Sequence, residues 1–122
     1  MLVGLVVAVL LAACGDGSAT AVRDVSVDEA VELAGDVEVT VVDVRTPEEF
    51  AAGHLPGAVN IDVQDPSFAD RIAELPKDGR YLVYCRTGNR SAAASAQMVE
   101  AGFTDVTNVT GGGYAELAAA SG

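Results

Sequence analysis

Short runs of β-branched residues alternate with amphipathic stretches along most of this chain. The clearest strand-like run is 39–44, and others lie near Val25 and at 58–61, 81–84 and 106–109. The stretches between them repeat apolar residues at intervals of three and four positions, which is typical of helices with one buried face. This alternation of strands and helices predicts an α/β fold around a largely parallel sheet.

Capping signals predict where several helices begin and end. Ser26 with Glu29, and Thr46 with Glu49, have the spacing of capping boxes. Three glycines stand at expected C-terminal caps, and a proline is expected to stop the helix that starts at Ser67: these residues are Gly35, Gly53, Gly102 and Pro76.

The first residues follow a different pattern. Residues 1–13 are almost entirely apolar and end in small residues before Cys14, a run shorter than the ~20 residues of a membrane-spanning helix. This segment resembles a bacterial lipoprotein signal peptide. The resemblance implies cleavage before Cys14, acyl chains such as palmitate attached through its thiol, and an exported protein anchored to the extracytoplasmic face of the cell membrane. A buried N-terminal helix is the alternative.

The segment after Cys14 divides the chain. Residues 15–21 are small and polar, which predicts a flexible tether. We therefore expect a signal peptide at 1–13, a lipidated cysteine and tether at 14–23, and one folded domain at 24–120. With 122 residues, 50% of them hydrophobic, the chain can bury a core of its own, and we expect a monomer.

Charge and composition exclude several functions. The formal net charge is −11 and the basic residues are scattered singly, so nucleic-acid binding is not expected. One histidine and dispersed carboxylates predict no metal site, and no cofactor is expected. Two cysteines in an exported chain would ordinarily suggest a disulfide. An acylated Cys14 cannot form one, which leaves Cys85 as a free thiol.

The stretch 81–91 carries the strongest chemical signal, because an apolar strand runs directly into Cys85, a loop containing Gly88 and the start of a helix. Amide N–H groups freed at such a helix start converge on one point and favour negative charge, and Arg86 and Arg90 add two cations. These features predict that Cys85 is a reactive thiolate with a lowered pKa. The alternative is a buried core cysteine.

Four motifs in order resemble those of the single-domain rhodanese family. They are DVRTPEEF at 43–50, GHLPGAVNI at 53–61, CRTGNR at 85–90 and GGGY at 111–114. The resemblance covers about 25–119 and implies a three-layer α/β/α fold with a five-stranded parallel sheet, the strand order 3-2-4-5-1 and the reactive loop after the fourth strand. One departure is that the family often has a tryptophan where this chain has Glu116-Leu117, which leaves the packing of the last helix open.

The same resemblance implies sulfur transfer of the thiosulfate sulfurtransferase type. The Cys85 thiolate attacks the outer sulfur of thiosulfate or a similar small anionic donor, sulfite leaves, and a thiol or cyanide removes the sulfur from a Cys85 persulfide. Loop amides stabilise the terminal sulfur, Arg90 braces the loop, and Arg86 either contacts the donor or faces water. The residues expected to bind the substrate are Arg45, Arg86, Thr87, Gly88, Asn89, Arg90 and Ser91.

Other residues near the loop have expected supporting roles. Asp43 accepts hydrogen bonds from loop amides or from Arg90, with a catalytic carboxylate as the alternative. Arg45 either helps to bind the donor or forms a surface ion pair. His54 fixes a turn or packs, with a Cys–His dyad as the alternative. The glycines at 111–113, with Gly112 as structural support, permit a close approach of the backbone to the loop, form a plain turn into the last helix, or do both.

Two other functions remain open from the sequence. A cysteine phosphatase of the cell-cycle type shares this fold, but its loop places five residues between cysteine and arginine, whereas four separate Cys85 from Arg90. The second is a non-catalytic sulfur-carrier or docking domain, and the retained cysteine is compatible with sulfur delivery to a protein partner. Loop length therefore favours sulfur chemistry over phosphate chemistry.

Overall fold

Five parallel strands form one sheet at the centre of the computed structural model, which describes residues 21–122. The order across the sheet is β1-β5-β4-β2-β3, which confirms the predicted α/β class and strand order. The predicted signal peptide, Cys14 and most of the tether lie outside the described residues. The strands are β1 (Arg23–Val25), β2 (Val39–Asp43), β3 (Val59–Asn60), β4 (Arg80–Tyr84) and β5 (Val106–Val109).

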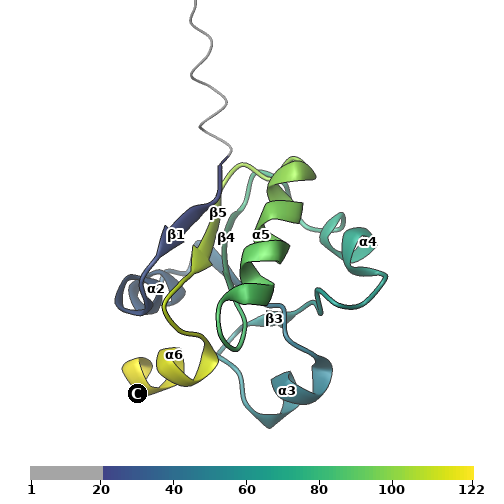
Figure 1. Cartoon of the computed structure of the whole chain (residues 1–122). Coiled ribbons are helices and arrows are strands. Elements are labelled where there is room, and N and C mark those ends of the chain that lie inside the picture. Colours follow the sequence, from purple (N-terminus) through teal and green to yellow (C-terminus); the bar gives the residue numbers. More distant parts are fainter. Residues whose placement is uncertain (1–20) are drawn as a thin grey trace, which may run out of the picture.

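Helices cover both faces of the sheet, so that the structure has three layers (Figure 1). On one face lie α2 (Val27–Ala34) and α6 (Tyr114–Ser121), and on the other lie α4 (Phe68–Ile72) and α5 (Asn89–Glu100). A short helix, α3 (Pro47–Ala52), follows β2 and lies beyond the carboxyl ends of the strands. Among these helices of residues 21–122, none is long and apolar enough to cross a bilayer.

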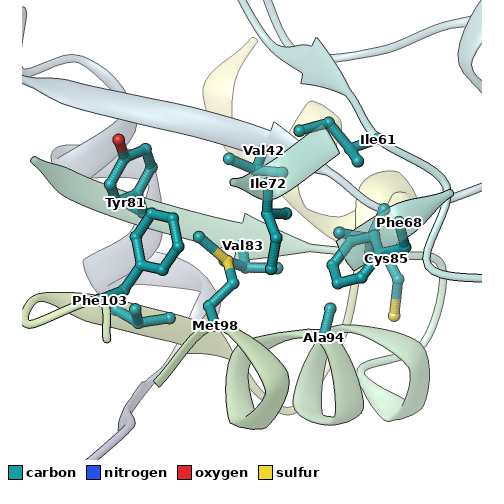
Figure 2. Packing of buried hydrophobic residues seen from close by; sticks show 12 residues of the cluster. Val42, Ile61, Phe68, Ile72, Tyr81, Val83, Cys85, Ala94, Met98 and Phe103 are labelled. Carbon is teal, nitrogen blue, oxygen red and sulfur yellow. The ribbon is translucent and has the colours of Figure 1, made fainter. Parts of the chain in front are cut away.

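The two faces of the sheet carry two separate cores. Successive residues of a strand point to opposite sides, so Val42 and Val83 face α5, whereas Val41 and Leu82 face α2. Figure 2 shows the core on the α5 side, with Cys85 at one end of the cluster. The cysteine is therefore anchored in the core at the carboxyl edge of β4.

Most predicted helix boundaries are present. Thr46 and Glu49 form both halves of a capping box at α3, and the Ser26 hydroxyl accepts a hydrogen bond from the Glu29 amide at 3.2 Å. These local bonds satisfy amide groups that have no partner inside the helix. The C-terminal caps of α2, α3 and α5 are Gly35, Gly53, and Ala101 followed by Gly102.

The helix that starts at Ser67 ends earlier than predicted. α4 stops at Ile72, and the chain then forms two tight turns, closed by the amides of Glu74 and Leu75, before it reaches Pro76. A residue that precedes proline is disfavoured in the helical conformation, so the helix loosens ahead of Pro76 rather than at it.

The last helix packs without a tryptophan. Leu117 is fully buried in the core on the α2 side, whereas Glu116 is exposed and its carboxylate accepts a hydrogen bond from the Gly113 amide at 2.8 Å. The packing that the sequence left open is therefore achieved by a leucine and by a cap at the start of α6.

Candidate active site

Cys85 lies directly after β4, where the Cys85 loop (residues 85–91) turns back into α5. The residue is 1% exposed, and its Sγ atom accepts hydrogen bonds from the amides of Gly88 at 3.0 Å and Ser91 at 3.3 Å. Gly88 has a φ of 104°, a left-handed conformation that favours glycine. The loop thus forms a cradle of N–H groups that suits a negatively charged sulfur atom.

Two opposing effects set the pKa of the Cys85 thiol. Burial raises this pKa, but hydrogen bonds from the Ser91 side chain and from the loop amides stabilise the thiolate and lower the pKa by more. The net pKa lies below the ordinary value for cysteine. Cys85 is therefore a buried core residue whose thiol nevertheless has a lowered pKa. The contribution expected from the loop amides is therefore present and the Ser91 hydroxyl adds to it, while Arg90 interacts with Cys85 electrostatically.

Ser91 contributes its hydroxyl group as well as its amide. Its Oγ atom is 3.5 Å from Cys85 Sγ and 3.2 Å from the carbonyl oxygen of Gly88. A hydroxyl group has one proton, so it donates to the Gly88 carbonyl while the thiol S–H donates to Oγ, or it donates to the sulfur when that atom is a thiolate. This group can therefore serve both charge states of the nucleophile.

Arg90, near the end of the loop, is bound by Glu49 of α3. The guanidinium donates two hydrogen bonds to the carboxylate, at 2.7 and 3.0 Å, and they are the main reason that the pKa of Glu49 falls to about 2. Glu49 also accepts hydrogen bonds from the amide and hydroxyl of Thr46. The sequence predicted Glu49 only as a cap, because no local pattern reveals a partner 41 positions away.

Asp43 is fully buried and makes different contacts from those predicted. Its carboxylate accepts hydrogen bonds from the amide and guanidinium of Arg45, the shortest at 2.6 Å, and from the Tyr84 hydroxyl at 2.7 Å. These contacts replace the expected ones to loop amides or to Arg90, because Arg45 folds back onto Asp43 and Glu49 binds Arg90. Asp43 thus supports the end of β4 and does not touch the sulfur.

Arg45 is 4% exposed, so it does not form the surface ion pair considered from the sequence. Its Nη2 atom also donates to the carbonyl oxygen of Gly53 at 2.7 Å, and its guanidinium carbon lies 4.4 Å from the centre of the Tyr114 ring. Burial lowers the pKa of Arg45, but hydrogen bonding and charge attraction to Asp43 and to Tyr84 together outweigh this effect and the pKa is raised. Arg45 therefore connects the end of β2 with the turn after α3 and the start of α6.

His54 lies on the surface, in the turn that follows α3. Its Nδ1 atom is 2.8 Å from the carbonyl oxygen of Phe50, and the two rings stack with their centres 3.7 Å apart. These contacts stabilise the turn. Within residues 21–122, none of the hydrogen bonds of this histidine reaches Cys85.

The close backbone approach expected of the glycines at 111–113 occurs at Gly113 and not at Gly112, the residue predicted as the support. A Cβ atom at Gly113 would collide with the backbone carbonyl groups of Cys85 and Arg86, whereas one at Gly112 would meet only side chains. The amide of Tyr114 then donates to the Cys85 carbonyl oxygen at 2.9 Å. The start of α6 therefore packs directly against the base of the Cys85 loop.

The remaining loop residues face outward. Arg86, Thr87 and Asn89 are exposed, and Arg86 forms no ion pair within residues 21–122. No group of three side chains in that part of the chain could hold a metal ion. A hollow of about 300 Å³, here called the α3–α6 hollow, opens beside Arg86, and its other lining residues are Arg45, Glu49, Ala52, Gly53, Tyr114 and Ala115.

Known proteins share this sequence and architecture. A family model described as Rhodanese-like domain matches residues 26–119. The chain is similar to a protein named thiosulfate sulfurtransferase GlpE from Pseudomonas putida, with 44% identity over 85 residues that cover 70% of this chain and 76% of that protein. A protein named sulfurtransferase from Allochromatium vinosum is 39% identical over 80 residues, which cover 66% of this chain and 73% of that protein.

Solved structures show the same likeness. A rhodanese-related protein from Thermoplasma volcanium has a TM-score of 0.63 and 32% identity, over 74% of this chain and 85% of that one. A rhodanese-like domain protein from Staphylococcus aureus also has a TM-score of 0.63, with 33% identity over 82% of this chain and 91% of that one. Both likenesses extend over most of the residues described.

Proposed function

Because the chain belongs to the rhodanese-like domain family, we propose that it is a sulfurtransferase in which Cys85 carries the transferred sulfur as a persulfide. The observation that carries this proposal is the pair of loop amides 3.0 and 3.3 Å from the Cys85 sulfur. Donors fixed at these positions stabilise negative charge on sulfur without having to reorganise during the reaction. A merely structural cysteine has no need of them.

The reaction has two halves. The Cys85 thiolate attacks the outer sulfur of thiosulfate or a similar donor, a new S–S bond forms, and the S–S bond of the donor breaks with its electron pair leaving on sulfite. A thiolate or cyanide then attacks the outer sulfur of the persulfide. The Cys85 S–S bond breaks, its electron pair returns to Cys85, and the amides of Gly88 and Ser91 again stabilise the thiolate.

The arginines of the loop have different roles in this proposal. Arg86 is exposed beside the nucleophile and is available to attract the anionic donor. Arg90 donates two hydrogen bonds to Glu49, so it braces the loop and is not free to bind a substrate anion. This engagement of Arg90, together with the short loop, argues against a phosphatase, in which that arginine would have to bind phosphate.

Mass spectrometry tests the proposal directly. Purified protein exposed to thiosulfate should gain one sulfur on the peptide that contains Cys85, and subsequent cyanide should remove it with release of thiocyanate. Cys85→Ser should neither gain sulfur nor turn over. A wild-type protein that remains unmodified would overturn the proposal. Sulfur on Cys85 that neither cyanide nor small thiols remove would instead indicate the carrier function.

A further inference from the structure

Two of the residues that line the α3–α6 hollow are connected to the Cys85 loop. Arg86 follows Cys85 in the chain, and the Tyr114 amide donates to the Cys85 carbonyl oxygen, so both lining residues are tied to the Cys85 loop. The volume of about 300 Å³ lies at the lower end of the ~300–1,000 Å³ typical of small-molecule sites. This is more space than a diatomic ion such as cyanide needs.

The charges around this hollow leave one cation free. Asp43 neutralises Arg45, and Arg90 neutralises Glu49, each at a distance of 2.7 Å or less. Arg86 has no such partner within residues 21–122, although the whole chain carries a net charge of −11. An anionic group that enters the hollow therefore meets one uncompensated positive charge, on the residue that follows Cys85 in the chain.

The other walls suit a small organic body. Ala52 and Ala115 present methyl groups, and the Tyr114 ring is held in place by the Arg45 guanidinium, 4.4 Å from its centre. The Tyr114 hydroxyl lies against Gly53, where a Cβ atom would collide with it, and this hydroxyl has no hydrogen-bond partner within the described part of the chain. The hollow thus offers apolar contact, one free hydroxyl group and one free cation.

We propose that the α3–α6 hollow binds the sulfur acceptor, and that this acceptor is a small organic thiol bearing a carboxylate. This inference rests on the proposed function. The carboxylate contacts Arg86, the carbon chain packs on the Tyr114 ring, and the acceptor thiolate attacks the outer sulfur of the Cys85 persulfide. The new S–S bond forms as the Cys85 S–S bond breaks, the electron pair returns to Cys85, and the acceptor leaves as a persulfide of unchanged total charge.

Steady-state kinetics with matched acceptors test the charge requirement. With thiosulfate saturating, 3-mercaptopropionate is compared with its neutral amide in the wild type and in Arg86→Gln. We expect the ratio of kcat/KM for acid over amide to be about tenfold higher in the wild type than in the variant. Comparing ratios cancels the difference in intrinsic reactivity of the two thiols and any general loss caused by the substitution.

A second variant tests the hollow itself. Ala115→Trp should fill the hollow and raise KM for both thiols by about tenfold, while the rate of transfer to cyanide changes by less than about twofold. Ala119→Trp, which is exposed on the same helix, serves as the matched control. This inference is overturned if the wild type and Arg86→Gln have the same acid-to-amide ratio of kcat/KM, or if Ala115→Trp leaves KM for the thiols unchanged. Both outcomes count only when transfer to cyanide is still observed. If the wild type transfers no sulfur to cyanide, the proposed function itself is overturned.

Discussion

Cys85 shows how one side chain can be buried and still be poised to carry charge. An isolated thiolate in an apolar core would be strongly disfavoured, and burial does raise the pKa of this thiol. The amides of Gly88 and Ser91 and the hydroxyl of Ser91 reverse that effect because they lie within hydrogen-bonding distance of the sulfur, at 3.0, 3.3 and 3.5 Å. The loop therefore supplies the solvation that water would supply outside.

Ser91→Ala should make Cys85 less reactive. Removing the hydroxyl takes away a donor to the thiolate while burial persists, so the pKa of the thiol should rise and alkylation by iodoacetamide at neutral pH should slow by about tenfold. The pH dependence of alkylation should move toward higher pH. Ser95→Ala is the control, because Ser95 is buried on the same helix and its hydroxyl has no hydrogen-bond partner among residues 21–122. Equal slowing in both variants would contradict the assigned role.

Gly113→Ala should be severely destabilising. A Cβ atom there would collide with the carbonyl groups of Cys85 and Arg86, which are backbone groups and cannot move aside without opening the loop. We expect a loss of about 3 kcal/mol or more in the free energy of unfolding, measured with urea. Gly35→Ala, at a helix cap with an ordinary φ of −86°, should change stability by less than about 0.5 kcal/mol. Similar values for the two variants would contradict the packing described.

Helix α3 is attached to the rest of the structure in an unusual way. None of its residues is buried, so apolar packing contributes little to its position. Its main connections are instead the Glu49–Arg90 ion pair and the Arg45 hydrogen bond to the Gly53 carbonyl oxygen. The position of α3 therefore depends on two guanidinium groups, and through Arg90 it is coupled to the Cys85 loop.

The Glu49–Arg90 pair should give a characteristic pH dependence of stability. The pKa of Glu49 is about 2 in the folded protein against 4.5 as its ordinary value, so the stabilisation is complete above about pH 4.5 and is lost as the pH falls toward 2. Glu49→Gln should lower the melting temperature at neutral pH, and the difference from the wild type should shrink across that window. It should also slow sulfur transfer by about tenfold, because the loop loses its brace.

The matched control for this prediction is Glu48→Gln. Glu48 is the exposed neighbour in α3 and forms no ion pair within residues 21–122. Thermal melts of the three proteins between pH 2 and pH 7 make the comparison. A gap between Glu49→Gln and the wild type that stays constant down to pH 2 would mean that the ion pair is not the source of the stabilisation.

The parallel strands place the start of the domain and Cys85 at opposite ends of the sheet. All five strands are parallel, so β1 begins at Arg23 on the edge opposite to the carboxyl edge that carries Cys85 (Figure 1). A tether that leads from Cys14 into β1 would therefore join the domain on the side away from its active site.

Cys14→Ser should block lipidation and processing of the protein. Wild-type protein is expected in the membrane fraction through its acyl chains, whereas the variant should accumulate as a precursor that still carries residues 1–13. Fractionation followed by mass spectrometry of the N-terminal peptide makes the measurement, with Cys85→Ser as a control that should remain membrane-bound. Wild-type protein recovered in the cytosol with residues 1–13 intact would contradict the export prediction.

Local signals in the sequence determined the elements of this fold. Alternating apolar runs specify strands such as 106–109, capping boxes specify helix starts such as Thr46, and the strand–Cys85–helix arrangement specifies the loop. Each of these depends on residues within a few positions of one another. The order of these elements along the chain could therefore be predicted directly from the sequence. The family resemblance supplied the order of the strands across the sheet.

Only the tertiary structure decided which side chains meet. Arg90 binds Glu49 across 41 positions, Tyr84 donates to Asp43 across the same separation, and Gly113 is the glycine of 111–113 that makes the close approach. Such pairings are set by the register of neighbouring strands and by how closely helices approach, to within a fraction of an ångström. The sequence leaves several possible partners for a charged residue, and only the packing around it in the folded protein determines which of them it contacts.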